Sequence, residues 1–394
     1  MHTKGPKLSK IANAIPDFYV LKIDKLANQL IAGGKDVIKL NLGKSEVPMR
    51  KEIADEFAGA MYDKARREII DSQGLLLLRE EIAKDYKETC GTIVSPNQVF
   101  INNGTSPFFL ELYMLLVNPG DEILFPLPYY PPYVANAHIA RAKPSFYPIC
   151  NGRVDMVALK KRFVPGKTKI VFLNSPGNPF GNVLSKTELK KIFDIVDGRA
   201  YIIADEIYDG FVYCGNFTSV MTVMNPERDK VVVLNGFSKI HHMYTRRLGY
   251  AVVPDELVPA LLRFQQHNVV CVDPVTQFAG LASLKNKKNL IAKDIVKEVA
   301  EQNKKLMATQ QLVKQTKLKF LKPDGSFYLC VDVGAYLGKK FSGSLTLAEE
   351  MLVAAGVAVT PGEDFGRNDF FRISLTSKRT IEGVKRMCQF VKRL

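Results

Sequence analysis

Short runs of β-branched and other apolar residues alternate with longer amphipathic stretches through the middle of the chain. The run "QVFINNG" (98–104) precedes the helical pattern "SPFFLELYMLL", and "KIVFLNSP" (169–176) precedes "SKTELKKIFDIV" (185–196). Two further apolar runs, "AYIIADEIY" (200–208) and "KVVVLNGF" (230–237), follow. This alternation predicts an α/β fold in which helices sandwich a mostly parallel sheet. Such sheets bind ligands at the carboxyl ends of their strands.

The last third of the chain has a different pattern. A long amphipathic stretch (285–315) is followed by the apolar run "GSFYLCVDV" (325–333) and by shorter strand-like and helical segments. This mixture predicts a second, smaller α+β domain. We expect a large domain over residues 46–284 and a small domain built from residues 1–45 and 285–394.

The composition is that of an ordinary globular protein, with 46% hydrophobic and 24% charged residues among 394. The net charge of +15 makes nucleic acid or an anionic cofactor a candidate partner. Many lysines, however, lie in amphipathic stretches such as 285–306, where they are typical of the solvated face of a helix. We therefore expect no nucleic-acid partner.

The six cysteines are scattered singly, and the five histidines form no ligand spacing with them. This arrangement predicts reduced cysteines, no disulfide framework and no metal site. The chain has no apolar run of about eighteen residues, and the opening stretch "MHTKGPKLSKIANAIPDF" has no apolar core of signal-peptide length. We expect no membrane segment and a cytoplasmic protein.

Two candidate ligand segments follow the first strands. In "NNGTS" (102–106), the backbone amides of Gly104, Thr105 and Ser106 at a helix start could cradle a phosphate, although a plain strand–helix turn has the same residues. The segment "PLPYYPPY" (126–133) offers tyrosines in a stiff loop. They could stack on a flat ring or pack in the core.

Three later segments also end apolar strands with polar groups. Asn178 in "NSPGNPFG" could bind a ligand oxygen or merely serve a turn. Asp205 and Glu206 in "IIADEIYDGF" could pair with a buried cation or cap a helix. Lys239 and Arg247 in "NGFSKIHHMYTRRLGY" could supply a nucleophilic amine and a phosphate-binding fork, the alternative for the lysine being a solvated surface position.

Together these segments describe a flat cationic ring that bears an aldehyde and a phosphate, which is pyridoxal 5'-phosphate. In their order and spacing they resemble the class I/II aminotransferases of the fold-type I pyridoxal-phosphate-dependent enzymes, from about residue 35 to the end. The helix segment "GLLLLREEIA" (74–83) and the strand segment "PDGSFYLCVDV" (323–333) also match that family.

The resemblance implies a role for each matching residue. Lys239 would form the internal aldimine, Asp205 would bond the pyridine nitrogen, and Tyr208 with Asn178 would bond the ring hydroxyl. Tyr130 would stack on the ring. Lys239, Asp205 and Tyr208 are therefore the expected catalytic residues. The expected phosphate-binding residues are Gly104, Thr105, Ser106, Ser238 and Arg247. The substrate would lie against Gly43, Asn178 and Arg372, with Arg372 clamping its α-carboxylate.

The resemblance also implies a reaction. An aminotransferase would move an amino group from an α-amino acid to a 2-oxo acid through a Lys239 aldimine, and family members are usually homodimers. The same scaffold hosts lyases, synthases and oxidases that act on amino acids, and these remain the alternative. A non-catalytic or nucleic-acid-binding protein with this scaffold is a third possibility, which the intact Lys239, Asp205 and Arg372 disfavour.

Several positions depart from the family pattern around the phosphate. Ile69 stands where a tyrosine commonly reaches the partner subunit's phosphate, and Gly236 replaces a frequent serine. Thr245 replaces a common glycine two residues before Arg247. Two phosphate contacts are therefore absent or replaced, and the basic "TRR" could compensate.

Other departures lie near the expected substrate. Phe180 changes the usual "NPTG" to "NPFG", and His241 and His242 beside the lysine are unusual. A catalytic role, packing and a substrate-side contact remain open for these histidines. The loop 104–108 holds no basic residue of the kind found in some dicarboxylate-selective relatives, which disfavours aspartate.

Overall fold

The computed structural model describes residues 7–338 and 340–394. Its main feature is an eight-stranded sheet with the order β2-β9-β8-β7-β6-β3-β4-β5. Strands β4, β3, β6, β7 and β8 run parallel to one another, whereas β2, β9 and β5 pair antiparallel at the two sides. The strands span Val99–Asn102 (β2), Glu122–Leu127 (β3), Lys143–Cys150 (β4), Arg153–Val154 (β5), Thr168–Asn174 (β6), Tyr201–Asp205 (β7), Lys230–Gly236 (β8) and Gly249–Val252 (β9).

Helices cover both faces of this sheet, as the unbroken apolar strands predict. Within β6, Ile170 and Phe172 belong to one apolar cluster, whereas Val171 and Leu173 belong to the other. The first cluster includes side chains of α4 (Ser106–Leu116), α5 (Pro131–Ile139) and α8 (Val258–Asn268). The second includes side chains of α3 (Leu76–Cys90), α6 (Met156–Arg162), α7 (Lys186–Val196) and α9 (Pro274–Lys285), and α2 (Lys51–Tyr62) packs on α9.

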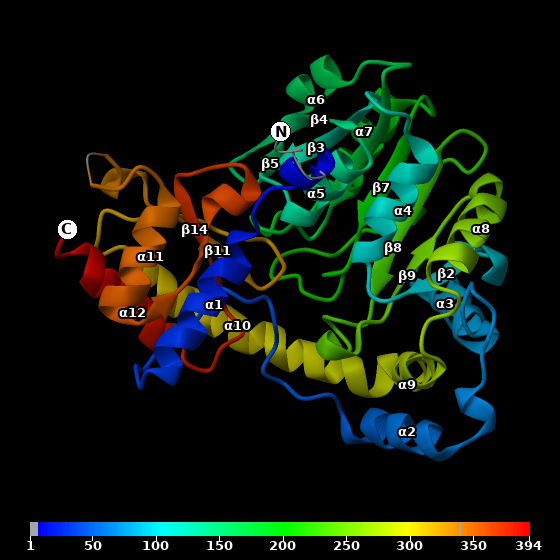
Figure 1. The fold of residues 1–394 in the computed structure, drawn as a ribbon, viewed down its shortest axis with the longest axis horizontal. Helices are drawn as coiled ribbons and strands as arrows, with labels where there is room; N and C mark the ends of the chain where they lie inside the picture. Colours follow the sequence, from blue (N-terminus) through cyan, green and yellow to red (C-terminus); the bar gives the residue numbers. More distant parts are fainter. Residues whose placement is uncertain (1–6, 339) are drawn as a thin grey trace, which may run out of the picture.

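A smaller α+β part lies beside the large sheet (Figure 1). Its four-stranded antiparallel sheet has the order β10-β11-β14-β13, and a separate parallel pair joins β1 to β12. These strands span Ile38–Lys39 (β1), Lys319–Leu321 (β10), Tyr328–Asp332 (β11), Val357–Ala358 (β12), Thr360–Pro361 (β13) and Phe370–Ser374 (β14). The helices here are α1 (Tyr19–Ala32), α10 (Ala292–Val313), α11 (Ser344–Ala355) and α12 (Thr380–Val391).

The fold class predicted from the sequence is confirmed, because an α/β part with a mostly parallel sheet stands beside a smaller α+β part. Residues from both ends of the chain share the core of the smaller part: Ile23 and Ile38 pack in one apolar cluster with Leu352 and Val384. The division into 46–284 and 1–45 with 285–394 stays a prediction. Within the described parts of the chain, none of the helices has the length and apolar character of a membrane span.

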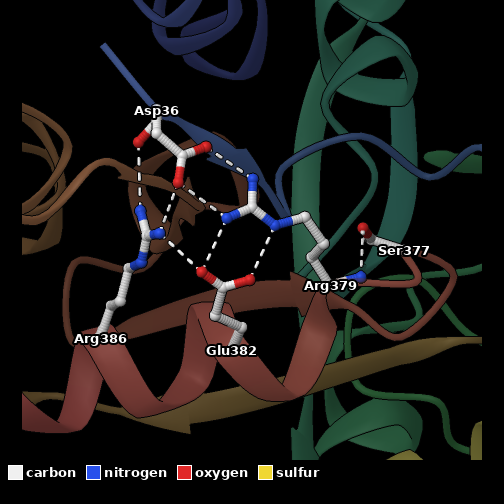
Figure 2. A network of polar contacts seen from close by, with 5 residues as sticks. All are labelled: Asp36, Ser377, Arg379, Glu382 and Arg386. Carbon is white, nitrogen blue, oxygen red and sulfur yellow. Dashed lines mark hydrogen bonds and ion pairs between the residues drawn. The ribbon is translucent and has the colours of Figure 1, made fainter.

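An exposed ion-pair network links the segment before β1 to the start of α12 (Figure 2). Asp36 accepts hydrogen bonds from Arg379 and Arg386, each at 2.6 Å, and Glu382 bridges the same two guanidinium groups. The hydrogen bond from Arg379, followed by that from Arg386, holds the pKa of Asp36 below its usual range. Because the pairs are exposed, they orient the two segments more than they stabilise the fold.

Candidate active site

A cavity of about 430 Å³ lies where β6, β7 and β8 end. Thr360 of β13 and Arg372 of β14 line it from the smaller sheet. The structure therefore brings together residues that the sequence spreads over more than three hundred positions. All of the predicted site residues except Gly104 line this cavity: Gly43, Thr105, Ser106, Tyr130, Asn178, Asp205, Tyr208, Ser238, Lys239, Arg247 and Arg372.

Lys239 lies three residues beyond the end of β8, and its Nζ donates a hydrogen bond to the Gly43 carbonyl at 2.8 Å. The rings of Tyr208, Tyr244 and Phe327 lie 5.1–5.5 Å from the same nitrogen. Burial, followed by the charges of two nearby arginines, lowers the pKa of Lys239 to about 7. A large fraction of this amine is therefore neutral near pH 7, and the neutral amine is the nucleophilic form.

Asp205 is the last residue of β7 and is 3% exposed. Its Oδ2 accepts a hydrogen bond from the Tyr133 hydroxyl at 2.8 Å, and its Oδ1 accepts one from the Ile207 amide at 3.1 Å. Burial raises the pKa of Asp205 to about 6, although both hydrogen bonds favour the ionised form. A buried carboxylate of this kind is stabilised by a cationic partner, which a protonated ring nitrogen would provide.

The neighbouring acid has a different position. Glu206 does not line the cavity, and its Oε1 accepts a hydrogen bond from the Val220 amide at 2.8 Å. Burial raises the pKa of Glu206 to about 8. Of the two adjacent acids, the structure therefore presents only Asp205 to the cavity.

The phosphate-binding prediction falls at the start of α4. Thr105 and Ser106 line the cavity there together with Arg247, whose Nη1 lies 3.4 Å from the Ser238 hydroxyl. Gly104 adopts a φ of +87°, and a Cβ at this position would lie 2.5 Å from the Arg247 guanidinium. A helix N-terminus, hydroxyl groups and an arginine together favour an anion.

The structure accounts for one of the departures near this site. A Cβ on Gly236 would lie 2.8 Å from the Gly249 Cα and 2.9 Å from the Leu248 carbonyl, because β8 and β9 approach closely at this pair. The backbone therefore leaves no room for the serine that is frequent here. Ile69 is 81% exposed and lies outside the cavity.

Arg372 is held at three points in β14. Its guanidinium donates to the Asn178 side chain at 3.0 Å, to the Asn41 carbonyl at 2.6 Å and to the Thr360 hydroxyl at 3.0 Å. Its buried Nε has no hydrogen-bond partner within the described chain. A fixed guanidinium with an unused donor beside a cavity is suited to bind a carboxylate.

Aromatic rings complete the site, and the sequence did not assign several of them. The Tyr208 and Tyr328 hydroxyls lie 3.1 Å apart, and the Tyr328 ring centroid lies 4.1 Å from the Arg372 guanidinium. Tyr133 is the last residue of the tyrosine-bearing loop 126–133, and its hydrogen bond to Asp205 has no signal in the sequence. Tyr244 carried no sequence signal beyond its place five residues after the lysine.

The two unusual histidines lie outside the cavity. His241 is buried, its Nδ1 lies 2.6 Å from the Ser283 hydroxyl, and burial lowers its pKa well below the usual range. This position agrees with packing. The His242 Nε2 contacts Glu298, which also accepts a hydrogen bond from the Ser45 hydroxyl at 2.9 Å.

The fold and the cavity define an aminotransferase of class I and II. Residues 35–391 match the family described as Aminotransferase class I and II, and the chain belongs to this family. It is 30% identical to an aspartate aminotransferase of Thermotoga maritima over 98% of this chain and 99% of that protein. It is 31% identical to a probable aspartate/prephenate aminotransferase of Aquifex aeolicus, over 93% of this chain and 94% of that protein.

A solved structure agrees with these sequence relatives. The crystal structure of the Thermotoga maritima aspartate aminotransferase matches with a TM-score of 0.88 and 29% identity, covering 98% of this chain and 100% of that one. The predicted family and the prediction of an aminotransferase enzyme are thereby confirmed.

Proposed function

We propose that this enzyme uses pyridoxal 5'-phosphate, bound covalently by Lys239, to transfer an amino group from an α-amino acid to a 2-oxo acid. The observation that carries the proposal is the position of the Lys239 amine. It shares one cavity with the buried Asp205 carboxyl and with the guanidinium groups of Arg247 and Arg372. A chain that only kept the scaffold would have no need for an amine with a lowered pKa at this point.

The residues present fit this cofactor. Asp205 would hold the ring nitrogen, because a protonated nitrogen offers the cation that its buried carboxyl lacks. Tyr130 would stack on the ring, and Tyr208 with Asn178 would bond the ring hydroxyl. The phosphate would be bound by Gly104, Thr105, Ser106, Ser238 and Arg247. When bound, the cofactor supplies an electron-accepting ring that stabilises negative charge at the substrate Cα.

The remaining chemistry belongs to side chains of this enzyme. Arg372 binds the substrate α-carboxylate and so fixes the orientation of the bonds at Cα. The Lys239 amine would accept the proton from the substrate Cα as a general base, and it would give this proton back as a general acid later in the same transfer. Tyr208 and Asp205 hold the ring in place during these proton movements.

We also propose that the enzyme is a homodimer. Large apolar side chains are exposed along one segment, from the end of α2 to the start of α3. Exposed apolar residues gathered in this way favour a protein–protein contact. The residues are Met61, Tyr62, Ile69, Leu76 and Leu77. A cytoplasmic location is proposed with it, supported by six cysteines that are all free.

The test uses purified holoenzyme and single amino acids, with and without a 2-oxo acid acceptor. We expect 2-oxo acid formation beyond one turnover only when the acceptor is present. Formation of ammonia, peroxide or a cyclised product without acceptor would instead identify the alternative lyase, oxidase or synthase.

The site assignment has its own test. Lys239→Ala should abolish the visible absorbance of the bound cofactor and lower turnover by more than about 10⁴-fold. Lys314→Ala, which removes an exposed lysine, should change neither. Borohydride reduction followed by peptide mapping should place the cofactor on Lys239. A label on another lysine would refute the assignment.

A further inference from the structure

One tyrosine of the cavity contacts candidate functional residues from both sheets. Tyr328 is the first residue of β11, in the small sheet, and is 2% exposed. It lines the cavity together with Tyr208, which lies three residues beyond the end of β7, and with Arg372 of β14. Its hydroxyl meets the first of these residues and its ring meets the second.

The hydroxyl of Tyr328 is fixed between two groups. Its oxygen lies 3.1 Å from the Tyr208 hydroxyl oxygen, and the two rings meet edge to face with their centroids 5.8 Å apart. The same hydroxyl fills the space that a Cβ on Gly43 would need. The Gly43 carbonyl accepts the hydrogen bond of the Lys239 amine. The Tyr328 hydroxyl therefore lies between Tyr208 and the backbone that bonds this amine.

The ring of Tyr328 lies under the Arg372 guanidinium. The guanidinium carbon is 4.1 Å from the ring centroid, which is a cation–π contact. The register of the small sheet explains the contact, because β11 and β14 pair Cys330 with Arg372. Tyr328 is two residues before Cys330 and therefore shares its face of the sheet. The contact thus follows from the pairing of two strands and holds Arg372 from one side.

The surroundings of the two hydroxyls indicate which one donates. Burial raises the pKa of Tyr208 well above its usual range. Burial also raises the pKa of Tyr328, but the charge of Arg372 over its ring opposes this rise. Of two neutral hydroxyls, the more acidic one is the better donor, so Tyr328 donates and Tyr208 accepts. Tyr208 thereby keeps its own proton for a second hydrogen bond in the cavity.

We propose that Tyr328 is a positioning residue, whose hydroxyl directs the Tyr208 proton toward the ring hydroxyl oxygen of the cofactor and whose ring holds Arg372 for the substrate carboxylate. This inference rests on the proposed function, which gives Tyr208 and Arg372 these roles. Successive hydrogen bonds polarise one another, so a donor behind Tyr208 makes Tyr208 a stronger donor. Tyr328 acts through both residues without a contact of its own to the reacting atoms.

Tyr328→Phe tests the hydroxyl, because it keeps the ring. The deprotonated form of the bound cofactor carries negative charge on the ring oxygen, and a weaker donor at Tyr208 stabilises that form less. In the purified holoenzyme, the midpoint of the pH-dependent change in cofactor absorbance should therefore rise by about 0.3–1 pH unit. With aspartate or phenylalanine as amino donor, kcat at pH 7 should fall about 3- to 10-fold while KM changes little.

Tyr328→Leu tests the ring. KM for the same two amino acids should rise about 3- to 30-fold above that of Tyr328→Phe, because the Arg372 guanidinium loses its aromatic partner. Tyr147→Phe is the matched control. It removes a buried hydroxyl that donates to the Phe172 carbonyl at 2.8 Å and does not line the cavity. This variant should change neither the absorbance midpoint nor KM.

The outcomes separate the inference from the proposed function. An unchanged or lowered midpoint in Tyr328→Phe, from an enzyme that carries its cofactor on Lys239, would overturn the inference alone. A lower melting temperature with unchanged midpoint, kcat and KM would also overturn it, because the hydroxyl would then serve only stability. An unchanged KM in Tyr328→Leu would refute the role of the ring. Absence of cofactor from Lys239 in the unmutated enzyme would refute the proposed function as well.

Discussion

The two walls of the cavity are built in different ways. The cofactor wall follows the ends of adjacent strands, where Asp205 and Lys239 each come from a single continuous motif. The substrate wall is assembled from distant segments: Arg372 bonds the Asn41 carbonyl, and Phe365 lies beside the start of α1. We therefore expect the cofactor wall to set the chemistry and the substrate wall to set which substrate is accepted.

Among the variants that distinguish the two walls, Arg372→Gln should have the largest effect on kcat/KM. Loss of the guanidinium removes the carboxylate partner, so kcat/KM should fall about 100- to 1,000-fold, or roughly 3–4 kcal/mol. The absorbance of the bound cofactor should be retained, since the cofactor wall is intact. Arg367→Gln is the control, because Arg367 pairs with Asp369 outside the cavity. A loss of cofactor binding in Arg372→Gln would contradict the claim that Arg372 serves the substrate and not the cofactor.

A smaller effect is expected from a change of pH, which should alter the rate at which the cofactor attaches to Lys239. The lowered pKa of Lys239, about 7, means that the neutral amine is the minor form at pH 6 and the major form at pH 8. Cofactor attachment to the cofactor-free protein should therefore accelerate about 10-fold between these values and then level off. Stopped-flow absorbance measures this rate. A rate that still rises steadily through pH 9 would show an ordinary exposed amine.

The smallest effect concerns a contact that joins the two walls. His242 and Ser45 both contact Glu298, and Lys239 donates to the Gly43 carbonyl. The segment that carries Lys239 and His242 is therefore joined at two points to the segment that carries Gly43 and Ser45. His242→Ala should lower kcat about 3- to 10-fold, with KM and cofactor absorbance little changed, because Gly43 is less firmly positioned.

The conservative variant tests whether this effect is one of positioning. His242→Gln keeps a donor for Glu298 and should restore most of kcat. A lowered melting temperature with unchanged kcat in His242→Ala would show that the contact serves only stability. Equal defects in the alanine and glutamine variants would also contradict a positioning role.

That the residues of the cofactor wall lie together could be predicted from the sequence, because their signals are local. A buried strand that ends in Asp205, or one followed by a turn with Gly104 before Ser106, is visible within ten residues. The Tyr133–Asp205 bond and the Tyr208–Tyr328 pair join separate elements, so no spacing along the chain indicates them. Periodicity in 1–45 likewise could not show that α1 begins beside Phe365.

The exposed network around Asp36 has a consequence for the last residues of the chain. Strand β1 lies between this network and Asn41, whose carbonyl holds Arg372, and α12 packs on β1. Helix α12 therefore supports the segment that positions Arg372, the residue proposed to bind the substrate carboxylate. Shortened proteins that end before Arg386 should lose substrate recognition while the large sheet is still folded.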